Sequence, residues 1–234
     1  MKTIYKKEVW DNYPQAFLAN NPAVMLELNK AVASLGKGNV ADYGCGATKI
    51  APFILNNPDV ISYTGFDASP EMVKLGRWHL AQFPEKPSEI ILANLEQITP
   101  SAYKLIKKGN MSKYIKQDGF DFGLSINSYY AWPKPVLILE NIYKSLKPGA
   151  RFVLVTPNLK LDMHALAEEA KRELVANPYF ESFRDQNLAI SANDKANLIE
   201  MDDLIDQVRG VGFKVIEANQ QFYHKGLNFI LLMK

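Results

Sequence analysis

The stretch that most constrains the fold is a short apolar run followed by a glycine turn, at residues 39–50. Residues 40–43 have the pattern of a strand, and Gly44 and Gly46 come directly after it. A turn of this kind between a strand and a helix leaves unpaired N–H groups and the positive end of the helix dipole facing a ligand. Since glycine lacks a Cβ, both glycines let the backbone turn tightly and approach that ligand. We therefore expect a ligand-binding turn after the first strand.

Strand patterns alternate with helical patterns through most of the chain. The strand patterns lie at residues 40–43, 60–66, 88–93, 120–126 and 151–156, and the helical ones at 22–35, 50–55, 69–81, 136–146, 161–176 and 201–209. Such alternation favours parallel strands joined by right-handed crossovers. Two further strand patterns, at 213–218 and 227–233, are too close for a crossover helix, so the last strand should be antiparallel. The expected fold class is α/β, with a doubly wound, seven-stranded, mostly parallel sheet.

The composition is that of an ordinary globular protein. Of the 234 residues, 47% are hydrophobic and 22% are charged. The net charge of +2 gives no overall field that would attract DNA or an anionic membrane, so no DNA partner is expected. No apolar run is long enough to suggest a membrane span, and the first residues lack the pattern of a signal peptide. We expect a cytoplasmic protein, a monomer or a homodimer, without a metal site.

We expect a single domain over residues 1–234 with two additions that either cover a substrate or pack on the domain. The first is an aromatic, helical N-terminal arm at residues 1–35. The second, residues 157–200, follows the fifth strand and should lie above the carboxyl edge of the sheet, where open α/β folds bind ligands. A further insertion at residues 100–118 is rich in lysine, which fits either a solvated helix face or a surface that contacts anions or a membrane.

An acidic residue strengthens the prediction of a ligand site at the glycine turn. Asp67 follows Gly44 by 23 positions, at the end of the second strand. An acidic side chain at this place binds the ribose hydroxyls in mononucleotide-binding units. A dinucleotide motif would have its third glycine at the position of Lys49. The sequence therefore favours a nucleoside site that is not a dinucleotide site.

These motifs resemble those of the class I S-adenosylmethionine-dependent methyltransferases. Residues 40–46 are similar to the first motif of that family and residues 65–69 to the second. Residues 120–127 resemble its fourth motif, and the resemblance covers residues 38–157 and 211–233. One departure is Thr48, which stands where the family commonly has a third glycine. The resemblance implies a Rossmann-like methyltransferase fold and S-adenosylmethionine as the cofactor.

The resemblance also implies which residues bind that cofactor. Gly44 and Gly46 would face its methionine part, Asp42 would brace the loop, and Asp67 would bind both ribose hydroxyls. The other implied cofactor residues are Ala68 and Met72 beside the adenine, Asn94 and Leu95 at its edge, and Ser125 or Asn127 near the sulfonium. Each of these residues also has a structural alternative, as a turn, core or capping residue.

The catalytic and substrate-binding candidates are aromatic residues and histidines. Methyl transfer from a sulfonium is an in-line displacement, to which alignment and exclusion of water contribute much of the rate. An acceptor that is protonated at neutral pH also calls for a base. The candidate catalytic residues are Tyr129, Tyr130 and His164, and the candidate substrate-binding residues are Tyr5, Trp10, Tyr13, Trp132 and His224. The alternative is that the histidines lie at the surface and the aromatic residues pack under the following helix.

The leading hypothesis is methyl transfer to O, N or S of a small molecule in a closed pocket. One alternative is an RNA or protein methyltransferase that docks its substrate through the lysines between residues 104 and 116. Another is a non-catalytic module that binds S-adenosylmethionine, since no base is obvious. The sequence does not identify the methyl acceptor.

Overall fold

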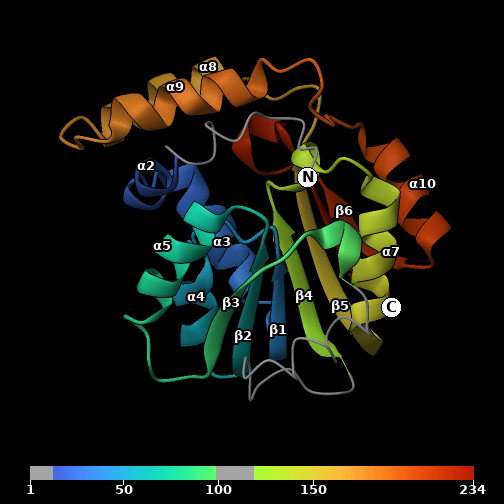
Figure 1. The fold of residues 1–234 in the computed structure, drawn as a ribbon. Helices are drawn as coiled ribbons and strands as arrows, with labels where there is room; N and C mark the ends of the chain where they lie inside the picture. The colour runs from blue at the N-terminus through green and yellow to red at the C-terminus, as the bar shows by residue number, and fades with distance from the viewer. Residues whose placement is uncertain (1–12, 99–118) are drawn as a thin grey trace.

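The computed structural model describes residues 13–98 and 119–234 (Figure 1). The predicted lysine-rich insertion at residues 100–118 lies outside the described part, and so do Tyr5 and Trp10 of the N-terminal arm. The ligand-binding turn and the strands and helices next to it fall within the described residues.

A seven-stranded sheet in the order β3-β2-β1-β4-β5-β7-β6 forms the centre of the molecule. Its strands are β1 (Gly38–Tyr43), β2 (Val60–Asp67), β3 (Ser88–Leu92), β4 (Phe120–Ile126), β5 (Leu146–Pro157), β6 (Lys214–Asn219) and β7 (Leu227–Met233). Strands β1 to β5 pair in parallel, whereas β7 is antiparallel to both β5 and β6. The predicted fold class, including the antiparallel last strand, is confirmed.

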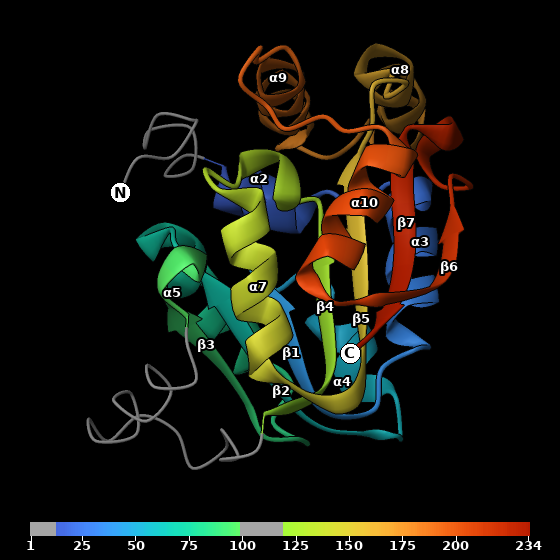
Figure 2. The same ribbon diagram turned by 90° about the vertical axis from the view of Figure 1, so that its right-hand side faces the viewer.

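Helices cover both faces of the sheet, with α7 and α10 on one face and α3 and α4 on the other (Figure 2). The helices are α2 (Pro14–Ala19), α3 (Ala23–Ala33), α4 (Ala51–Asn56), α5 (Pro70–Leu80), α7 (Pro135–Ser145), α8 (Met163–Glu173), α9 (Phe180–Ser191) and α10 (Met201–Val211). The described residues also form the short 3₁₀ helices η1 (Leu95–Gln97), η2 (Tyr129–Ala131) and η3 (Tyr223–Lys225). Among the described helices, none is both long enough and apolar enough to cross a bilayer.

The start of α5 shows how local sequence sets an element boundary. Ser69 is the N-cap, and its Oγ accepts a hydrogen bond of 3.3 Å from the N–H of Met72. Pro70 occupies the first helical position, where its fixed φ fits and its missing N–H costs nothing. This boundary fixes the direction in which the chain leaves the end of β2, directly after Asp67.

The insertion after β5 differs in part from the prediction. The helix expected at residues 161–176 is present as α8, but the second helix of the insertion, α9, was not expected. Asn177 and Pro178 separate them, and Asn177 Oδ1 accepts a hydrogen bond from the N–H of Tyr179. The two helices lie across one end of the sheet (Figure 1). That end is the carboxyl edge of the parallel strands, because the insertion follows β5.

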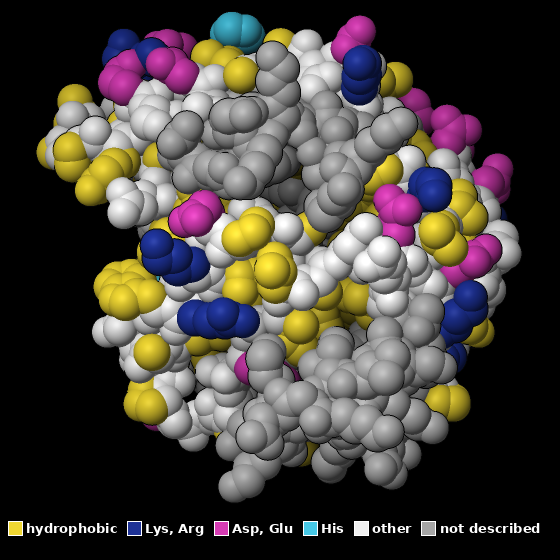
Figure 3. All heavy atoms as spheres, in the orientation of Figure 1, with side chains coloured by type: hydrophobic (Ala, Val, Ile, Leu, Met, Phe, Trp, Pro, Cys, Tyr) yellow, Lys and Arg dark blue, Asp and Glu magenta, His cyan; other side chains and the backbone are white. Residues whose placement is uncertain are grey.

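Each face of the sheet packs its own apolar cluster against the covering helices. One cluster joins β-strand residues to α3 and α4, and includes Leu28, Ile54 and Val153. The other joins them to α7 and α10, and includes Leu139 and Leu154. On the face in Figure 3 acidic and basic residues are interspersed.

Replacing Leu154 by alanine should lower the free energy of unfolding by about 2–5 kcal/mol, because a fully buried leucine at the centre of β5 would leave a cavity. The matched control is Leu159→Ala, since Leu159 is 64% exposed and should change stability by less than about 0.5 kcal/mol. Urea denaturation of both variants measures the difference. Equal losses would contradict the packing described for β5.

Candidate active site

Three backbone N–H groups fix the glycine turn to the end of β2. The N–H groups of Gly44 and Cys45 donate to the carbonyl oxygen of Phe66, at 2.8 and 3.1 Å. The N–H of Gly46 donates to Oδ2 of Asp67 at 2.8 Å. The φ angles of Gly44 and Gly46 are +75° and +54°, the left-handed region that glycine adopts without strain. The turn and the acidic residue predicted to act with it are therefore one hydrogen-bonded unit.

Gly44 also lies against the chain that follows β4. A Cβ on Gly44 would lie 2.5 Å from Cβ and Oγ of Ser128. Ser128 is fixed in this place, because its Oγ donates to the carbonyl of Tyr43 and accepts a hydrogen bond from Nε1 of Trp132. Ser125 Oγ lies 2.7 Å from the same Ser128 oxygen. The absence of a side chain at Gly44 thus serves close packing of two loops at the carboxyl edge.

The residue in place of a third glycine keeps a glycine-like backbone. Thr48 has a φ of +61° and is fully buried. A β-branched residue rarely adopts this conformation, which costs on the order of 1–3 kcal/mol. Thr48 Oγ1 hydrogen-bonds to the carbonyl of Ala47 at 2.7 Å and to Nδ1 of His79 at 3.2 Å. The turn therefore keeps its shape despite the departure from the glycine pattern.

Asp42 lies beneath the turn, and its carboxyl group is buried. The hydroxyl of Tyr63 donates to Oδ2 of Asp42 at 2.7 Å. Burial raises the pKa of Asp42 to about 7, although the Tyr63 hydrogen bond partly offsets this by favouring the charged form. Asp42 braces the end of β1 while part of it faces the neighbouring cavity.

The carboxylate of Asp67 is held by the backbone on both of its oxygens. Oδ1 accepts from the N–H of Ser69 and Oδ2 from that of Gly46, each at 2.8 Å. Burial raises the pKa of Asp67, and the hydrogen bonds from these backbone N–H groups lower it again in part. Each carboxylate oxygen has a second lone pair, so Asp67 can still accept hydrogen bonds from a ligand.

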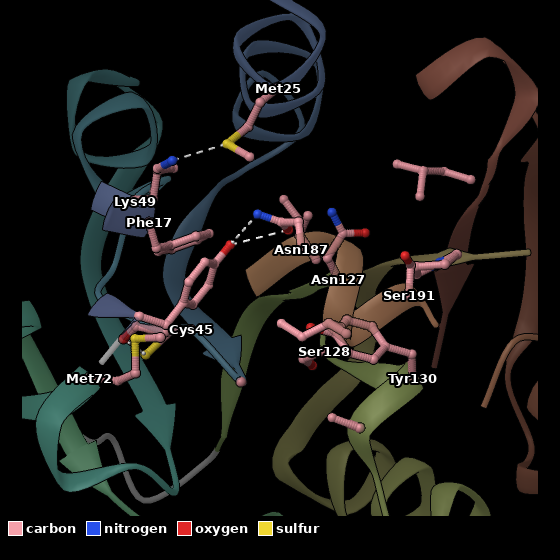
Figure 4. A pocket seen from close by; sticks show the side chains of 18 of the residues that line it. Phe17, Met25, Cys45, Lys49, Met72, Asn127, Ser128, Tyr130, Asn187 and Ser191 are labelled. Atoms are coloured by element: carbon pink, nitrogen blue, oxygen red, sulfur yellow. Dashed lines mark hydrogen bonds between the residues drawn. The ribbon is translucent and has the colours of Figure 1, made fainter. Parts of the chain in front are cut away.

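A cavity of about 460 Å³ opens beside the turn, within the size range of small-molecule sites. At one end, nine of the residues predicted to bind the cofactor line its wall: Asp42, Gly44, Gly46, Asp67, Ala68, Met72, Asn94, Leu95 and Asn127. The other walls come from α2, α3, α8, α9 and η3. Figure 4 shows Asn127, Ser128 and Tyr130 entering from the connection after β4. Helices from distant parts of the chain therefore enclose one space.

Hydrogen bonds join the N-terminal helices to the insertion over this cavity. The pairs are Asn187 Nδ2 with Tyr13 Oη at 3.0 Å, Asn20 Nδ2 with the Tyr179 carbonyl at 3.3 Å, the Ala23 N–H with Glu173 Oε2 at 2.7 Å, and Asn177 Nδ2 with the Ala19 carbonyl at 2.9 Å. The partners are 150 or more residues apart in the sequence. We refer to α2, α8 and α9 together as the roof of the cavity.

Comparisons with known proteins identify the family. The family model described as "Methyltransferase domain" matches residues 9–218. The chain belongs to this methyltransferase family. No curated protein matches the sequence.

Solved structures show the same fold at low sequence identity. A chain from the complex of the Haloferax volcanii Trm112 methyltransferase activator with a methyltransferase has a TM-score of 0.65 and 14% identity, with 100% of this chain and 98% of that chain covered. A SAM-dependent methyltransferase from Aquifex aeolicus has a TM-score of 0.61 and 13% identity, with 98% of each chain covered. A SAM-dependent methyltransferase from Thermotoga maritima has a TM-score of 0.59 and 16% identity, covering 98% of this chain and 100% of that chain.

The structure of this methyltransferase brings some of the predicted catalytic and substrate residues to the cavity and leaves others away from it. Tyr13, Tyr130 and Trp132 line the cavity. Tyr129 does not, because its hydroxyl donates to Gln207 Oε1 at 2.7 Å under α10. Ser125 is fully buried at its contact with Ser128 and also lies outside the lining.

Neither of the two histidines predicted to act on the substrate reaches the methyltransferase cavity. His164 is an exposed residue of α8. His224 is exposed on η3, and its Nε2 lies 2.6 Å from Oε2 of Glu169 on α8. The surface positions that the sequence left open as an alternative are the ones found in the structure.

Sequence reasoning missed several residues of the cavity wall. They are Phe17, Met25 and Asn29 on α2 and α3, Lys49 after the turn, Phe183 and Asn187 on α9, and Tyr223 on η3. A signal existed for α9, where Phe180 and Phe183 stand three positions apart, as on one face of a helix. Lys49 was noted only as a mismatch to a dinucleotide motif.

Gly44→Ala should destabilise the methyltransferase more than Gly149→Ala, although both residues have nearly the same φ, +75° and +74°. Both alanines carry the cost of a left-handed backbone, about 1–2 kcal/mol. Only the Cβ at residue 44 also collides with Ser128, since nothing lies within 4 Å of a Cβ at Gly149. We expect a further loss on the order of 1–3 kcal/mol in urea denaturation. Equal losses would contradict the close approach at Gly44.

The pKa of Asp42 predicts how stability depends on pH. The carboxyl group of Asp42 has a pKa of about 7 in the folded protein and an ordinary pKa near 4 in the unfolded chain. At a pH between these two values, Asp42 is protonated in the folded protein and ionised in the unfolded chain. The free energy of unfolding should therefore fall as the pH rises from about 4 to about 7, a window set by the two pKa values of Asp42. Asp42→Asn should flatten this slope in denaturation curves recorded across that range. Part of it should remain, because the pKa of Asp67 is also raised.

The control for this measurement is Asp194→Asn, since Asp194 is exposed in the loop that follows α9. It should leave the pH slope unchanged. An Asp42→Asn slope as steep as that of the wild type would contradict the buried, protonated state.

Proposed function

We propose that this S-adenosylmethionine-dependent methyltransferase acts on O, N or S of a small molecule enclosed in the cavity under the roof. The observation that carries the proposal is the single cavity that runs from the glycine turn and Asp67 to the space beneath α8 and α9. A concave space of about 460 Å³ covered by helices suits a small acceptor beside a cofactor, whereas a macromolecular substrate needs a more open surface.

The residues at the turn fit S-adenosylmethionine. The carboxylate of Asp67 can accept both ribose hydroxyls, and a side chain at Gly46 would enter the space next to Phe17 and Met72. Asn127 has a φ of +51°, and its buried Oδ1 has no hydrogen-bond partner among the described residues. A ligand in the cavity would satisfy that oxygen. When bound, the cofactor supplies a methyl group on a sulfonium.

The far part of the cavity suits an acceptor with an apolar body and a polar group. Phe17, Phe180 and Phe183 contribute aromatic surface. Two buried polar atoms on its wall, Asn29 Nδ2 and Tyr223 Oη, have no partner among the described residues. Because a buried polar atom without a partner costs about 1–3 kcal/mol, a polar group of the acceptor would gain by binding there.

The protein contributes to the reaction mainly by positioning and by excluding water. Trp132 and Tyr130 line the cavity after β4, and Ser128 holds the Trp132 indole through its N–H. An aromatic wall favours a sulfonium or an amine through cation–π contact. The roof keeps water from the reacting groups. We propose that the chain is a single domain, and that residues 1–35 and 157–200, which include the roof, form one cover on it. Alignment of this kind supplies much of the rate in a displacement that needs no new oxyanion.

The proposal is tested first by calorimetry and then by a screen. S-adenosylmethionine and S-adenosylhomocysteine should each bind the full chain with one site. A screen of small phenols, amines and thiols with isotope-labelled S-adenosylmethionine should then transfer the label to at least one compound. Transfer to RNA or protein but to no small molecule would overturn the proposed acceptor class.

Replacing Asp67 by asparagine should weaken S-adenosylhomocysteine binding by about 10- to 100-fold, because the loss of a charge-assisted hydrogen bond costs on the order of 1.5–3 kcal/mol. The matched control is Asp59→Asn, at an exposed position before the other end of β2, which should bind as the wild type does. Titration calorimetry measures both. Undiminished binding by the Asp67 variant would show that the ribose lies elsewhere.

A further inference from the structure

Lys49 is a buried cation on the wall of the cavity. It follows the glycine turn, and 6% of its surface is exposed. Its Nζ donates to the carbonyl of Asn20 and lies 3.2 Å from Sδ of Met25. Figure 4 shows the side chain reaching toward Met25 with Phe17 beside it. The ammonium group is thus held at the junction of the turn, α2 and α3.

Two aromatic rings complete the surroundings of this ammonium group. Nζ lies 4.3 Å from the centroid of Phe17 and 5.6 Å from that of Phe183. Ring faces attract cations, but each contact stabilises the charge only weakly compared with a carboxylate. Burial lowers the pKa of Lys49 to about 7, because the surroundings disfavour the charged form. These contacts therefore fix the position of the Lys49 ammonium group but supply no negative charge to neutralise it.

Within residues 13–98 and 119–234, no carboxylate forms an ion pair with Lys49. Arg184, a second cation on the described part of the cavity wall, differs in this respect. It pairs with Glu181 at 2.5 Å and with Asp185 at 2.7 Å. A buried charge without a counter-charge carries an uncompensated desolvation cost of several kcal/mol. An anion that enters the cavity would offset that cost at Lys49 and not at Arg184.

The surroundings select a carboxylate among anions. A single ammonium group matches one negative charge, whereas a phosphate would bring nearly two charges into a largely apolar space. The place is also next to the glycine turn, since the Phe17 ring lies 3.4 Å from where a Cβ of Gly46 would be. We propose that Lys49 binds a carboxylate that enters this cavity. This rests on the proposed function, whose two ligands each offer a source: the amino-acid end of the cofactor and an acidic methyl acceptor.

The first arm of the test uses Lys49→Met, which keeps an apolar stem and removes the charge. The control is Lys74→Met, an exposed lysine of α5. Calorimetry compares S-adenosylhomocysteine with methylthioadenosine, which lacks the amino-acid part. If the cofactor supplies the carboxylate, K49M weakens S-adenosylhomocysteine binding by at least about tenfold and leaves methylthioadenosine binding unchanged. K74M binds both compounds as the wild type does.

The second arm applies if K49M and wild type bind S-adenosylhomocysteine equally. Thermal shifts are recorded for matched pairs of arylalkanoic acids and their primary amides, such as 3-phenylpropionate and 3-phenylpropionamide, with and without S-adenosylhomocysteine. If the acceptor supplies the carboxylate, the acids raise the melting temperature of the wild type more than their amides do. K49M should lose this preference for acids.

The proposal is overturned if K49M binds S-adenosylhomocysteine like the wild type and no acid is preferred over its amide. Failure of the wild type to bind S-adenosylhomocysteine would instead contradict the proposed function, and the acid and amide pairs still test Lys49 without it. Since K49M removes a buried unpaired charge, it should melt no lower than the wild type. Lys49→Gln replaces it in both arms if K49M does not fold.

Discussion

The ligand site depends on the hydrogen bonds that tie the glycine turn to the end of β2. Gly44 and Cys45 donate to the carbonyl of Phe66, and Gly46 donates to the carboxylate of Asp67. Because β1 and β2 are parallel neighbours, both strands end at the same edge, and these bonds turn that shared edge into one binding surface. They also leave Asp67 with an accessible lone pair on each oxygen. The same bonds thus support the local fold and shape the site that we propose for the cofactor.

The roof extends this surface into an enclosed cavity. Helix α2 comes from the start of the chain and α8 and α9 from the insertion after β5, and hydrogen bonds between them cross 150 or more residues of sequence. Such non-local bonds bring apolar side chains over the carboxyl edge without filling the space beneath. The consequence is a site suited to exclude water around a small acceptor, as a displacement on a sulfonium requires. Lys49 stands where the turn meets the roof, and it lines the cavity that we propose both ligands share.

Much of the fold could be predicted from the sequence, because strand and helix periodicities are local properties. The seven strands, the antiparallel last strand and the Ser69 cap are such cases. Helix α9 was missed, since the predicted helical pattern ended at residue 176, before the break at residues 177–178. The proposed cofactor end could be predicted from the sequence, because a glycine turn and an acidic residue recur at a fixed spacing. The proposed acceptor end could not, because Asn29, Asn187 and Tyr223 come together only through tertiary packing.

The most direct test of this account is a crystal structure of the chain with S-adenosylhomocysteine. It should show the ribose hydroxyls within hydrogen-bond distance of the Asp67 carboxylate, the adenine beside Met72 and Asn94, and the sulfur facing the space beneath α8 and α9. A nucleoside bound away from Asp67, or a sulfur that faces solvent outside the roof, would contradict the central claim that this methyltransferase encloses a small acceptor.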